Sequence, residues 1–417
     1  MIKQLCHRAL IAETEMRTLS TKVKNRVLRE VAKALIAEQD DILESNQLDL
    51  AAGEKNGLSA ALLDRLALNP SRIKGMADSL ETIASFPDPI GEVVEGFRTE
   101  SGLSIQKVRA PLGIVAIIYE SRPNVTIDAA ALCLKSSNVT ILRGSSAALN
   151  SNRILADLFA RVGESNGMPK NAVQLLDDPG RDSLNKLIVQ NKYIDVLIPR
   201  GGKQLKESMM ANSTIPMIFT GDGTCHIYLD ETAEDDKILP IILNAKTQRP
   251  GTCNSVECVL IQKDKNYLTE EIVEALLEAD VKVNITQELY NLLPHELKTK
   301  SYLSGEELFG VEFLSKEILL HQVESVDVAI AFINQHGTQH SDCILTQNVT
   351  NAEKFLNEVD SAVVYLNAST RFSDGGEFGF GGEIGISTQK LHARGPMGIK
   401  QLTSEKFLVR GQGQIRE

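Results

Sequence analysis

Apolar segments of strand length alternate with segments of helical periodicity from residue 113 onward, and this alternation limits the fold more than any other feature. The run GIVAIIY precedes the helical pattern NVTIDAAALCLKSS, and the run NVTILRG precedes AALNSNRILADLFARVG. The series continues through AVQLLDD, a short helix from Arg181, YIDVLIPRGG, another helix and IPMIFTG, which we expect to form a further strand. Such alternation predicts an α/β fold whose parallel sheet has right-handed crossovers.

The regions on either side depart from this pattern. Residues 1 to about 86 carry apolar positions at three- and four-residue intervals, which indicates helices. Proline and glycine breaks then separate two short alternating runs, which predict strands or a hairpin that reaches out of the main body. We expect a cofactor domain over 1–230 interrupted by a hairpin at about 100–112, a catalytic α/β domain over 231–365, and a tail over 366–417 that pairs with the hairpin.

Composition excludes several classes of protein. The 417 residues suffice for two or three domains with their own cores. A net charge of −11 without a basic stripe argues against binding to nucleic acid. The sequence has no apolar run of membrane length and begins with a charged amphipathic pattern, so we expect a cytoplasmic protein with no membrane contact. The six cysteines form no CxxC pair, which argues against a zinc site or a disulfide framework.

The candidate nucleophile is Cys253, in the segment NAKTQRPGTCNSVE. A helical pattern precedes this segment and an apolar strand pattern follows it, so the Pro-Gly turn can lift the thiol into a cleft and aim its own N–H at a carbonyl oxygen. Lys246 and Arg249 would favour the reactive thiolate. The alternative for any cysteine is a place in the core.

The remaining cysteines fit that alternative better. Cys133, Cys258 and Cys343 lie in apolar patterns and are expected in the core. Cys225 stands beside His226, but adjacent residues of a regular strand point to opposite faces, so core packing is favoured over a catalytic dyad.

Polar and glycine-rich residues follow three of the predicted strands. They are Glu120, Arg122 and Asn124 after the first strand, Arg143, Gly144, Ser145 and Ser146 after the second, and Arg200, Gly201, Gly202 and Lys203 after the fourth. Ligands of parallel sheets bind at such strand ends, where a phosphate can meet glycine backbone and a helix N-terminus. No G-x-G-x-x-G is present and RGGKQ does not complete a P-loop, which argues against a nucleotide triphosphatase. Each glycine pair alone also fits an ordinary strand-to-helix turn.

The order of these motifs resembles the aldehyde dehydrogenase superfamily. Within the superfamily the chain is most similar to the γ-glutamyl phosphate reductases, also called glutamate-5-semialdehyde dehydrogenases. The segments that carry this resemblance are IYESRPNVTIDAAALCLKSSN, IPRGG, NAKTQRPGTCNSVE, HGTQHSD, LNASTRF and STQKLHARGPMG. The resemblance covers essentially the whole chain and implies a Rossmann-type cofactor domain, an α/β catalytic domain and a small oligomerisation element made of the hairpin and the tail. Bifunctional relatives carry a preceding kinase domain, and this chain resembles the stand-alone form.

The resemblance implies reduction of L-glutamate 5-phosphate by NADPH to L-glutamate 5-semialdehyde and phosphate, the second step of L-proline biosynthesis. Cys253 would attack the acyl phosphate, while the Asn124 amide and the Cys253 N–H stabilise the oxyanion. Phosphate would leave a thioester, which hydride reduces to a thiohemiacetal that releases the aldehyde.

The resemblance also assigns cofactor residues. Arg143, with Ser145 and Ser146 beside Gly144, would hold the 2′-phosphate of NADPH, since the planar fork of arginine binds phosphate oxygens in pairs. Gly201 and Gly202 match the turn near the cofactor phosphates. Glu312 matches the glutamate that binds the nicotinamide ribose, and its alternative is an exposed glutamate at the start of a strand.

The substrate carries anionic groups and an ammonium group, so its pocket needs cations and an anion. The candidates are Arg122, Glu120, Arg249, Arg371, His392 and Arg394. We hypothesise that Arg122 or Arg394 holds an anionic group of the substrate. His336 and His340 are expected to be structural, because the thiolate route needs no imidazole.

Three rival functions stay open. An aldehyde-oxidising dehydrogenase would need a general base, but Thr220 and Gly221 stand where the superfamily carries it, and only Asp222 lies nearby. A reductase of another acyl phosphate would differ in pocket residues alone. A catalytically silent binding protein is opposed by the joint presence of Cys253, Asn124 and Arg143.

The resemblance further implies a homo-oligomer, and functional coupling to glutamate 5-kinase is conceivable because the acyl phosphate can cyclise before it diffuses away.

Overall fold

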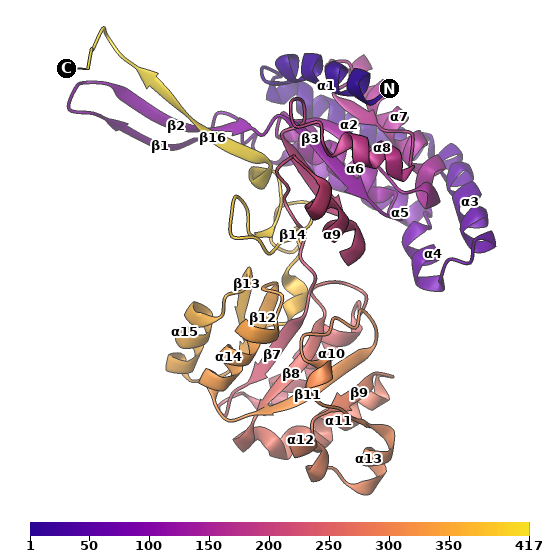
Figure 1. Ribbon diagram of the computed structural model, residues 1–417, viewed down its shortest axis with the longest axis vertical. Helices are drawn as coiled ribbons and strands as arrows, with labels where there is room; N and C mark the ends of the chain where they lie inside the picture. Colours follow the sequence, from indigo (N-terminus) through magenta and orange to yellow (C-terminus); the bar gives the residue numbers. More distant parts are fainter. Residues whose placement is uncertain (417) are drawn as a thin grey trace. The chain divides into compact units, whose positions relative to one another are not determined.

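The computed structural model describes residues 1–416 and forms two compact units (Figure 1). Unit 1 comprises residues 1–219 and 379–385 and the chain from 397 onward, and unit 2 comprises residues 220–378 and 386–396. The chain therefore passes between the units at Phe219, whereas the sequence predicts a domain boundary near residue 230. Among the described residues, no helix is both long enough and apolar enough to cross a membrane.

Five helices begin unit 1, as the apolar spacing predicts. They are α1 (Ile2–Met16), α2 (Thr21–Ala37), α3 (Gln39–Lys55), α4 (Ala60–Leu66) and α5 (Pro70–Ser85). Side-chain caps fix the starts of α2, α4 and α5, where Ser20, Ser59 and Asn69 accept hydrogen bonds from backbone N–H groups of the first turn. The expectation of a helical N-terminal region is confirmed.

A four-stranded parallel sheet in the order β5-β4-β3-β6 follows in the same unit. Its elements are β3 (Ile114–Tyr119), α6 (Asn124–Lys135), β4 (Val139–Arg143), η1 (Ser146–Ala148), α7 (Leu149–Ser165), β5 (Val173–Leu175), α8 (Arg181–Leu187), β6 (Val196–Arg200) and α9 (Lys203–Asn212). Every residue of β3 is buried. Because successive side chains of a strand point to opposite faces, both faces of the sheet are covered here.

One predicted strand of this region is wrong. The segment IPMIFTG does not form a strand and makes only two isolated bridges, from Met217 to Leu197 of β6 and from Thr220 to Ser387. Pro216 has no N–H to extend a ladder, and the segment leads directly to the start of unit 2 at Thr220.

The predicted hairpin is present, and the C-terminal tail pairs with it. The hairpin consists of β1 (Val93–Arg98) and β2 (Ser104–Pro111), and β16 (Thr403–Arg410), which follows η5 (Lys400–Leu402), completes an antiparallel sheet in the order β1-β2-β16. Figure 1 shows this sheet projecting from the helical part of unit 1. All six residues of β1 are exposed, so both faces of this strand meet solvent.

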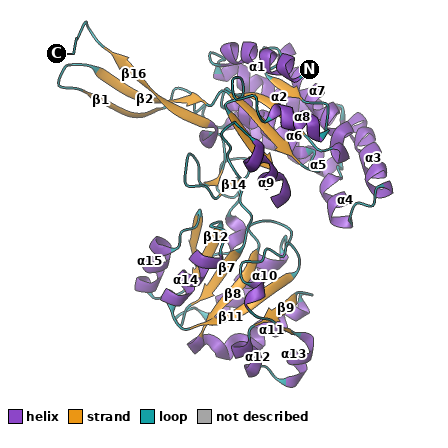
Figure 2. Cartoon of the chain, in the orientation of Figure 1, coloured by secondary structure: helices purple, strands orange, loops and turns teal. Residues whose placement is uncertain are grey.

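Unit 2 is built on a seven-stranded sheet in the order β10-β9-β11-β8-β7-β12-β13, with parallel neighbours throughout (Figure 2). Its strands are β7 (Cys225–Leu229), β8 (Val256–Gln262), β9 (Lys282–Ile285), β10 (Tyr302–Leu303), β11 (Glu317–Val323), β12 (Ser341–Leu345) and β13 (Val363–Leu366). Its helices are α10 (Asp235–Thr247), η2 (Lys263–Leu268), α11 (Thr269–Glu278), α12 (Gln287–Leu292), α13 (His295–Lys300), η3 (Glu306–Leu308), α14 (Val326–His336), α15 (Val349–Glu358) and η4 (Thr370–Phe372). A short antiparallel pair, β14 (Ile386–Ser387) and β15 (Gly395–Pro396), completes it.

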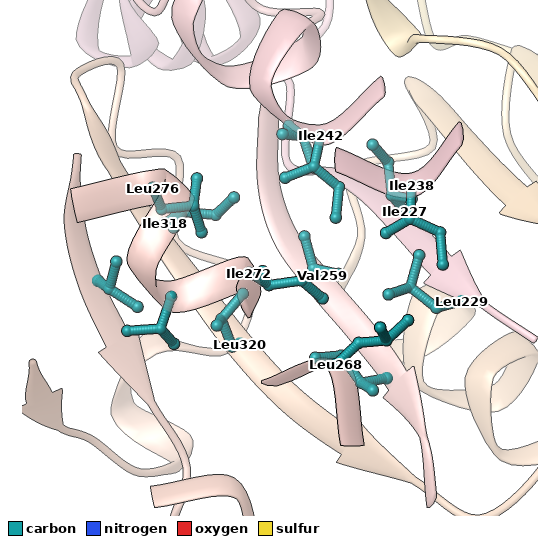
Figure 3. Packing of buried hydrophobic residues seen from close by; sticks show 14 of the residues in the cluster. Ile227, Leu229, Ile238, Ile242, Val259, Leu268, Ile272, Leu276, Ile318 and Leu320 are labelled. Carbon is teal, nitrogen blue, oxygen red and sulfur yellow. The ribbon is translucent and has the colours of Figure 1, made fainter. Parts of the chain in front are cut away.

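Unit 2 has two buried clusters, one between this sheet and the helices α10 and α11, and one between the sheet and the helices α14 and α15. Figure 3 shows Ile227 of β7 and Val259 of β8 meeting Ile242 of α10 and Ile272 of α11, all fully buried. Such close packing fixes the ends of β7 and β8, from which the candidate active site is built. Cys133, Cys225, Cys258 and Cys343 are buried, which confirms their placement in the core.

Candidate active site

Cys253 lies on the turn that joins α10 to β8, as the sequence predicts. The turn is closed by the Ser255 N–H, which donates to the Thr252 carbonyl oxygen at 3.0 Å, and by the Thr252 hydroxyl, which donates to the Arg249 carbonyl oxygen at 2.8 Å. Cys253 is half-buried, whereas the other five cysteines are buried. Its thiol is therefore the cysteine sulfur best placed to meet a substrate.

Cys225, the first residue of β7, contacts this turn. The Cys225 thiol donates a hydrogen bond to the Cys253 carbonyl oxygen at 3.2 Å. Burial raises the pKa of the Cys225 thiol well above its ordinary value, so the group keeps the proton that it donates. His226 instead pairs its Nδ1 with Asp342 Oδ1 at 2.7 Å, which agrees with the expectation that Cys225 and His226 form no dyad.

Asn254 ties the same turn to the segment after β13. Its Nδ2 donates to the carbonyl oxygens of Ser373 at 3.0 Å and Arg371 at 3.2 Å, and its own carbonyl oxygen accepts a hydrogen bond from the Thr370 hydroxyl at 2.7 Å. These contacts are buried or partly buried, so water competes weakly for them. The main chain at residues 253 and 254 is thus held from two directions.

Two arginines place positive charge near the nucleophile. Arg249 is exposed on the turn, and Arg371 is half-buried and donates from Nε to Gln248 Oε1 at 2.8 Å. Burial lowers the pKa of Arg371, Asp374 opposes that shift, and the charge of Arg249 adds to it. Because the Arg371 carbonyl oxygen accepts a hydrogen bond from Asn254 Nδ2, Arg371 lies beside the turn that carries Cys253. Such an arrangement suits an anionic substrate.

Lys246 does not act on Cys253 in the way the sequence suggests. Its ammonium group is fully buried and donates to Glu257 Oε2 at 2.5 Å and to the Val256 carbonyl oxygen at 2.9 Å. Burial lowers the pKa of Lys246 and raises the pKa of Glu257 to about 7, while the mutual attraction of the pair opposes both shifts. The Glu257 carboxylate compensates this cation, so the expectation that Lys246 favours the Cys253 thiolate is corrected.

Glu312 precedes β11 and is partly buried rather than exposed. Its Oε1 accepts a hydrogen bond from the Gly223 N–H at 2.7 Å. This places the carboxylate beside the segment that supports Cys253, within the same unit.

In unit 1, the residues after β3 meet those after β6. Glu120 is exposed, and its Oε2 accepts a hydrogen bond from the Gly202 N–H at 3.0 Å, beside Gly201 at the N-terminus of α9. Arg122 is exposed in the turn before α6. Asn124 begins α6 and donates from Nδ2 to Asp128 Oδ2 at 3.0 Å.

Arg143 ends β4 with only 8% of its surface exposed. One terminal nitrogen of its guanidinium donates to the Pro179 carbonyl oxygen and to the Gly180 carbonyl oxygen, the latter at 3.3 Å, and burial lowers its pKa. Gly144 follows against Asn152, and the Ser145 hydroxyl accepts a hydrogen bond from the Ser121 N–H at 3.3 Å, while Ser146 is exposed.

These residues fit a phosphate-bearing cofactor on two observations. Within the part of the chain that the structure describes, the buried Nε of Arg143 has no hydrogen-bond partner. A β-carbon at Gly202 would meet open space, so the backbone there is accessible at the start of α9, which has no side-chain cap. Phosphate oxygens accept hydrogen bonds from guanidinium N–H groups and from the N–H groups of helix N-termini.

The last two predicted substrate residues lie between β14 and β15 in unit 2. His392 is exposed with a φ of 72°. Arg394 donates from Nη1 to Asp360 Oδ1 at 3.0 Å and from Nη2 to the Asp360 carbonyl oxygen at 2.7 Å. The guanidinium of Arg394 is thus engaged by Asp360, which Lys390 also contacts at 2.5 Å.

Several residues that shape the nucleophile turn escape sequence reasoning. Gly223, Asn254, Thr370 and Ser373 have no motif of chemical function, and Cys225 fits a core cysteine equally well. The only available signal for Gly223 is its place in the run TGDGTC, two residues before a buried strand.

Comparisons with known proteins identify the family of the chain. The profile of the aldehyde dehydrogenase family matches residues 1–291. The gamma-glutamyl phosphate reductase of Campylobacter curvus is 49% identical, over 96% of this chain and 96% of that protein. Gamma-glutamyl phosphate reductase 1 of Bacillus licheniformis is 47% identical, over 98% of each.

The crystal structure of gamma-glutamyl phosphate reductase from Thermotoga maritima superposes with a TM-score of 0.94 at 40% identity and covers 100% of both chains. An acetylating aldehyde dehydrogenase from Geobacillus thermoglucosidasius shares the fold, with a TM-score of 0.72 at 17% identity over 100% of this chain and 97% of that one. The chain belongs to the aldehyde dehydrogenase family, in its branch of gamma-glutamyl phosphate reductases.

Proposed function

We propose that this chain reduces L-glutamate 5-phosphate to L-glutamate 5-semialdehyde and phosphate with NADPH, the second step of L-proline biosynthesis. The observation that carries the proposal is the half-buried Cys253 on a turn held by buried and partly buried hydrogen bonds, with Arg249 on the turn and Arg371 beside it. The whole-length similarity to gamma-glutamyl phosphate reductases supports the choice of substrate.

In the proposed reaction the Cys253 thiolate attacks the acyl carbon, and the Cys253 N–H and the Asn124 amide donate to the oxyanion. Arg249 and Arg371 stabilise the departing phosphate, which leaves a thioester on Cys253. The thioester on Cys253 would be reduced by the hydride that NADPH supplies when it is bound. The thiohemiacetal on Cys253 then collapses, the aldehyde leaves, and the thiolate is regenerated.

The cofactor would be held by Arg143, Gly144, Ser145, Ser146, Gly201, Gly202 and Glu312. The unpartnered Nε of Arg143 supports a contact with the 2′-phosphate that distinguishes NADPH from NADH. The Glu120 carboxylate accepts a hydrogen bond from the Gly202 N–H. A cofactor phosphate at this helix terminus would replace that carboxylate as the acceptor.

The substrate would be held by Arg122, Glu120, Arg249, Arg371, His392 and Arg394. Arg371 has the strongest support of these, because it is half-buried and its main chain is hydrogen-bonded to Asn254, the residue after Cys253. Arg394 has weaker support, because Asp360 already binds its guanidinium.

The reverse reaction tests the proposal. Reduction of NADP⁺ is followed with glutamate-5-semialdehyde in the presence and absence of phosphate, for the wild type and for Cys253→Ala. We expect activity that requires both phosphate and Cys253. Activity without phosphate would mean that water resolves the thioester, and an aldehyde-oxidising dehydrogenase would then describe the chain better.

The chain is further proposed to work in the cytoplasm as a homo-oligomer assembled through the sheet β1-β2-β16. Apolar side chains stand exposed on this sheet at Val93, Phe97, Phe407 and Val409. Exposed apolar surface of this kind is typical of a protein interface. Light scattering after size exclusion should give a multiple of 45.6 kDa, and Phe97→Glu with Phe407→Glu should lower it toward the monomer.

Functional coupling to glutamate 5-kinase is a separate proposal, based on the tendency of the acyl phosphate to cyclise. A coupled assay measures the fraction of acyl phosphate that reaches the reductase. Transfer that is unchanged by dilution of the two enzymes at a fixed ratio would support coupling, and transfer that falls as free diffusion requires would oppose it.

A further inference from the structure

The Cys225 thiol is a buried polar group that the proposed reaction leaves without a role. Its exposed fraction is 0%, and it donates to the carbonyl oxygen of Cys253, the nucleophile itself. Sulfur is a weak donor, but the contact is partly buried, so water competes less for the same carbonyl oxygen.

A chain of polar groups continues from Cys225 to the other side of the turn. The Cys225 sulfur lies 3.8 Å from His340 Nδ1, and that nitrogen lies 2.8 Å from the Ser341 hydroxyl. The Ser341 and Ser373 hydroxyls are 2.5 Å apart, and the Ser373 carbonyl oxygen accepts a hydrogen bond from Asn254 Nδ2. The chain thus returns to the residue after the nucleophile.

Two successive peptide groups of the turn are held through their carbonyl oxygens. The carbonyl oxygen of residue 253 is held by Cys225, and the next carbonyl oxygen, at residue 254, is held by Thr370 at 2.7 Å. Since a peptide bond is planar, fixing its oxygen also fixes the plane on which the Cys253 Cα lies. The direction of the Cys253 side chain is therefore limited by contacts on its C-terminal side.

We propose that Cys225 is a positioning residue, whose thiol hydrogen bond to the Cys253 carbonyl oxygen fixes the nucleophile turn in its reactive orientation. The inference rests on the proposed function for its kinetic consequences. Cys225 touches neither substrate nor cofactor in this scheme, and it acts only through Cys253. Misplacement of a nucleophile lowers the rate of the chemical step more than it weakens binding.

Three variants test this role. Cys225→Ala removes the donor, Cys225→Ser keeps a hydroxyl donor of similar size, and Cys343→Ala makes the same truncation at another fully buried cysteine of the same sheet. The Cys343 thiol donates a weak hydrogen bond to the Ile344 carbonyl oxygen at 3.5 Å, and Cys343 has no part in the circuit. For each variant the kcat and KM of the phosphate-dependent reaction, the melting temperature and the rate of Cys253 alkylation by iodoacetamide are measured.

We expect Cys225→Ala to lower kcat about tenfold, which is the effect expected from the loss of one hydrogen bond in the transition state. The KM values of both substrates should be nearly unchanged. Alkylation of Cys253 should slow in parallel, because the thiol is no longer held near Arg249 and Arg371. Cys225→Ser should recover most of both rates. Cys343→Ala should lose melting temperature to a similar extent while it keeps kcat and the alkylation rate.

Equal kcat and equal alkylation rates in Cys225→Ala and Cys343→Ala would overturn the proposal. A Cys225→Ser variant no better than Cys225→Ala in both rates would overturn it as well, because the donor would then be irrelevant. If the wild type itself shows no phosphate-dependent activity, the proposed function fails, and the alkylation rates alone decide the role of Cys225.

Discussion

A β-carbon placed at Gly223 would lie 1.4 Å from the carbonyl oxygen of Cys253, so the main chains of these two residues are in direct contact. No side chain fits between them without a shift of the nucleophile turn. The absence of a β-carbon at Gly223 is therefore a condition for the position of Cys253.

Gly223→Ala should consequently lower kcat by about 100-fold, since displacement of a reacting group by about 1 Å has an effect of that order. Steady-state kinetics measures the loss. Gly75→Ala is the matched control, because a β-carbon at Gly75 would meet nothing within 4 Å and alanine favours a helix. Full activity in Gly223→Ala would show that the turn tolerates the shift and would contradict the geometry.

Burial predicts that one thiol reacts in the native protein. Cys253 is half-buried, while burial raises the pKa of Cys6 to about 11 and the pKa values of Cys133 and Cys343 to about 12. Because the thiolate is the reactive form, a thiol reagent at pH 7.5 should modify one cysteine per native chain and all six after denaturation. Mass spectrometry of the native adduct should locate it at Cys253, and its absence from Cys253→Ala is the control.

The sequence predicts the supporting framework better than the details of the site. The N-terminal helices, the parallel strands, the hairpin and the turn that carries Cys253 follow from apolar spacing and from Pro-Gly breaks, which are local signals. The failure at IPMIFTG has a local cause too, because Pro216 interrupts a run that otherwise has strand composition.

The contacts around Cys253 have no such signal. Gly223, Thr370 and Ser373 meet the turn only after the chain folds, and the hydrogen bond from Thr370 to Asn254 spans 116 positions of sequence. Lys246 shows the same limit. Its position in the sequence suggests an influence on Cys253, but in the folded protein its ammonium group is buried and pairs with the Glu257 carboxylate. Such pairings depend on tertiary structure, which local patterns do not encode.

The carboxyl group of Asp128 predicts a dependence of stability on pH. Burial raises its pKa to about 6, against a hydrogen bond from Asn124 and the charge of Arg200. The folded state then binds more protons than the unfolded state between pH 4 and 6, so this group's contribution to stability is largest at low pH and is lost as the pH rises through about 6. The urea midpoint of the wild type relative to Asp128→Asn should fall between pH 4 and pH 7. A constant difference would show that the carboxyl titrates normally.

The unpartnered Nε of Arg143 predicts a change in cofactor preference. Arg143→Gln should lower kcat/KM with NADPH by about tenfold or more, as expected for a charge-assisted hydrogen bond, and should affect NADH less. Arg153→Gln, which removes an exposed arginine paired with Asp177, is the control and should leave the ratio of the two cofactors unchanged. Equal losses of kcat/KM with NADPH and NADH in Arg143→Gln would contradict a contact with the 2′-phosphate. They would indicate that Arg143 only supports the loop through the Pro179 and Gly180 carbonyl groups.

Removal of one partner of the buried pair Lys246 and Glu257 should lower the unfolding free energy more than removal of both partners. Lys246→Met leaves the Glu257 carboxyl buried without its cation, which should cost about 3–5 kcal/mol of unfolding free energy, while Lys246→Met with Glu257→Leu should recover much of this loss. The single variant should also lose stability as pH rises, because its buried carboxyl, already at a pKa of about 7 in the pair, would have to fold in the protonated form. Urea unfolding at pH 6 and pH 9 measures both effects. Lys300→Met, at the exposed pair with Glu296, is the control and should change little, so equal losses in the two single variants would contradict a structural role for the buried pair.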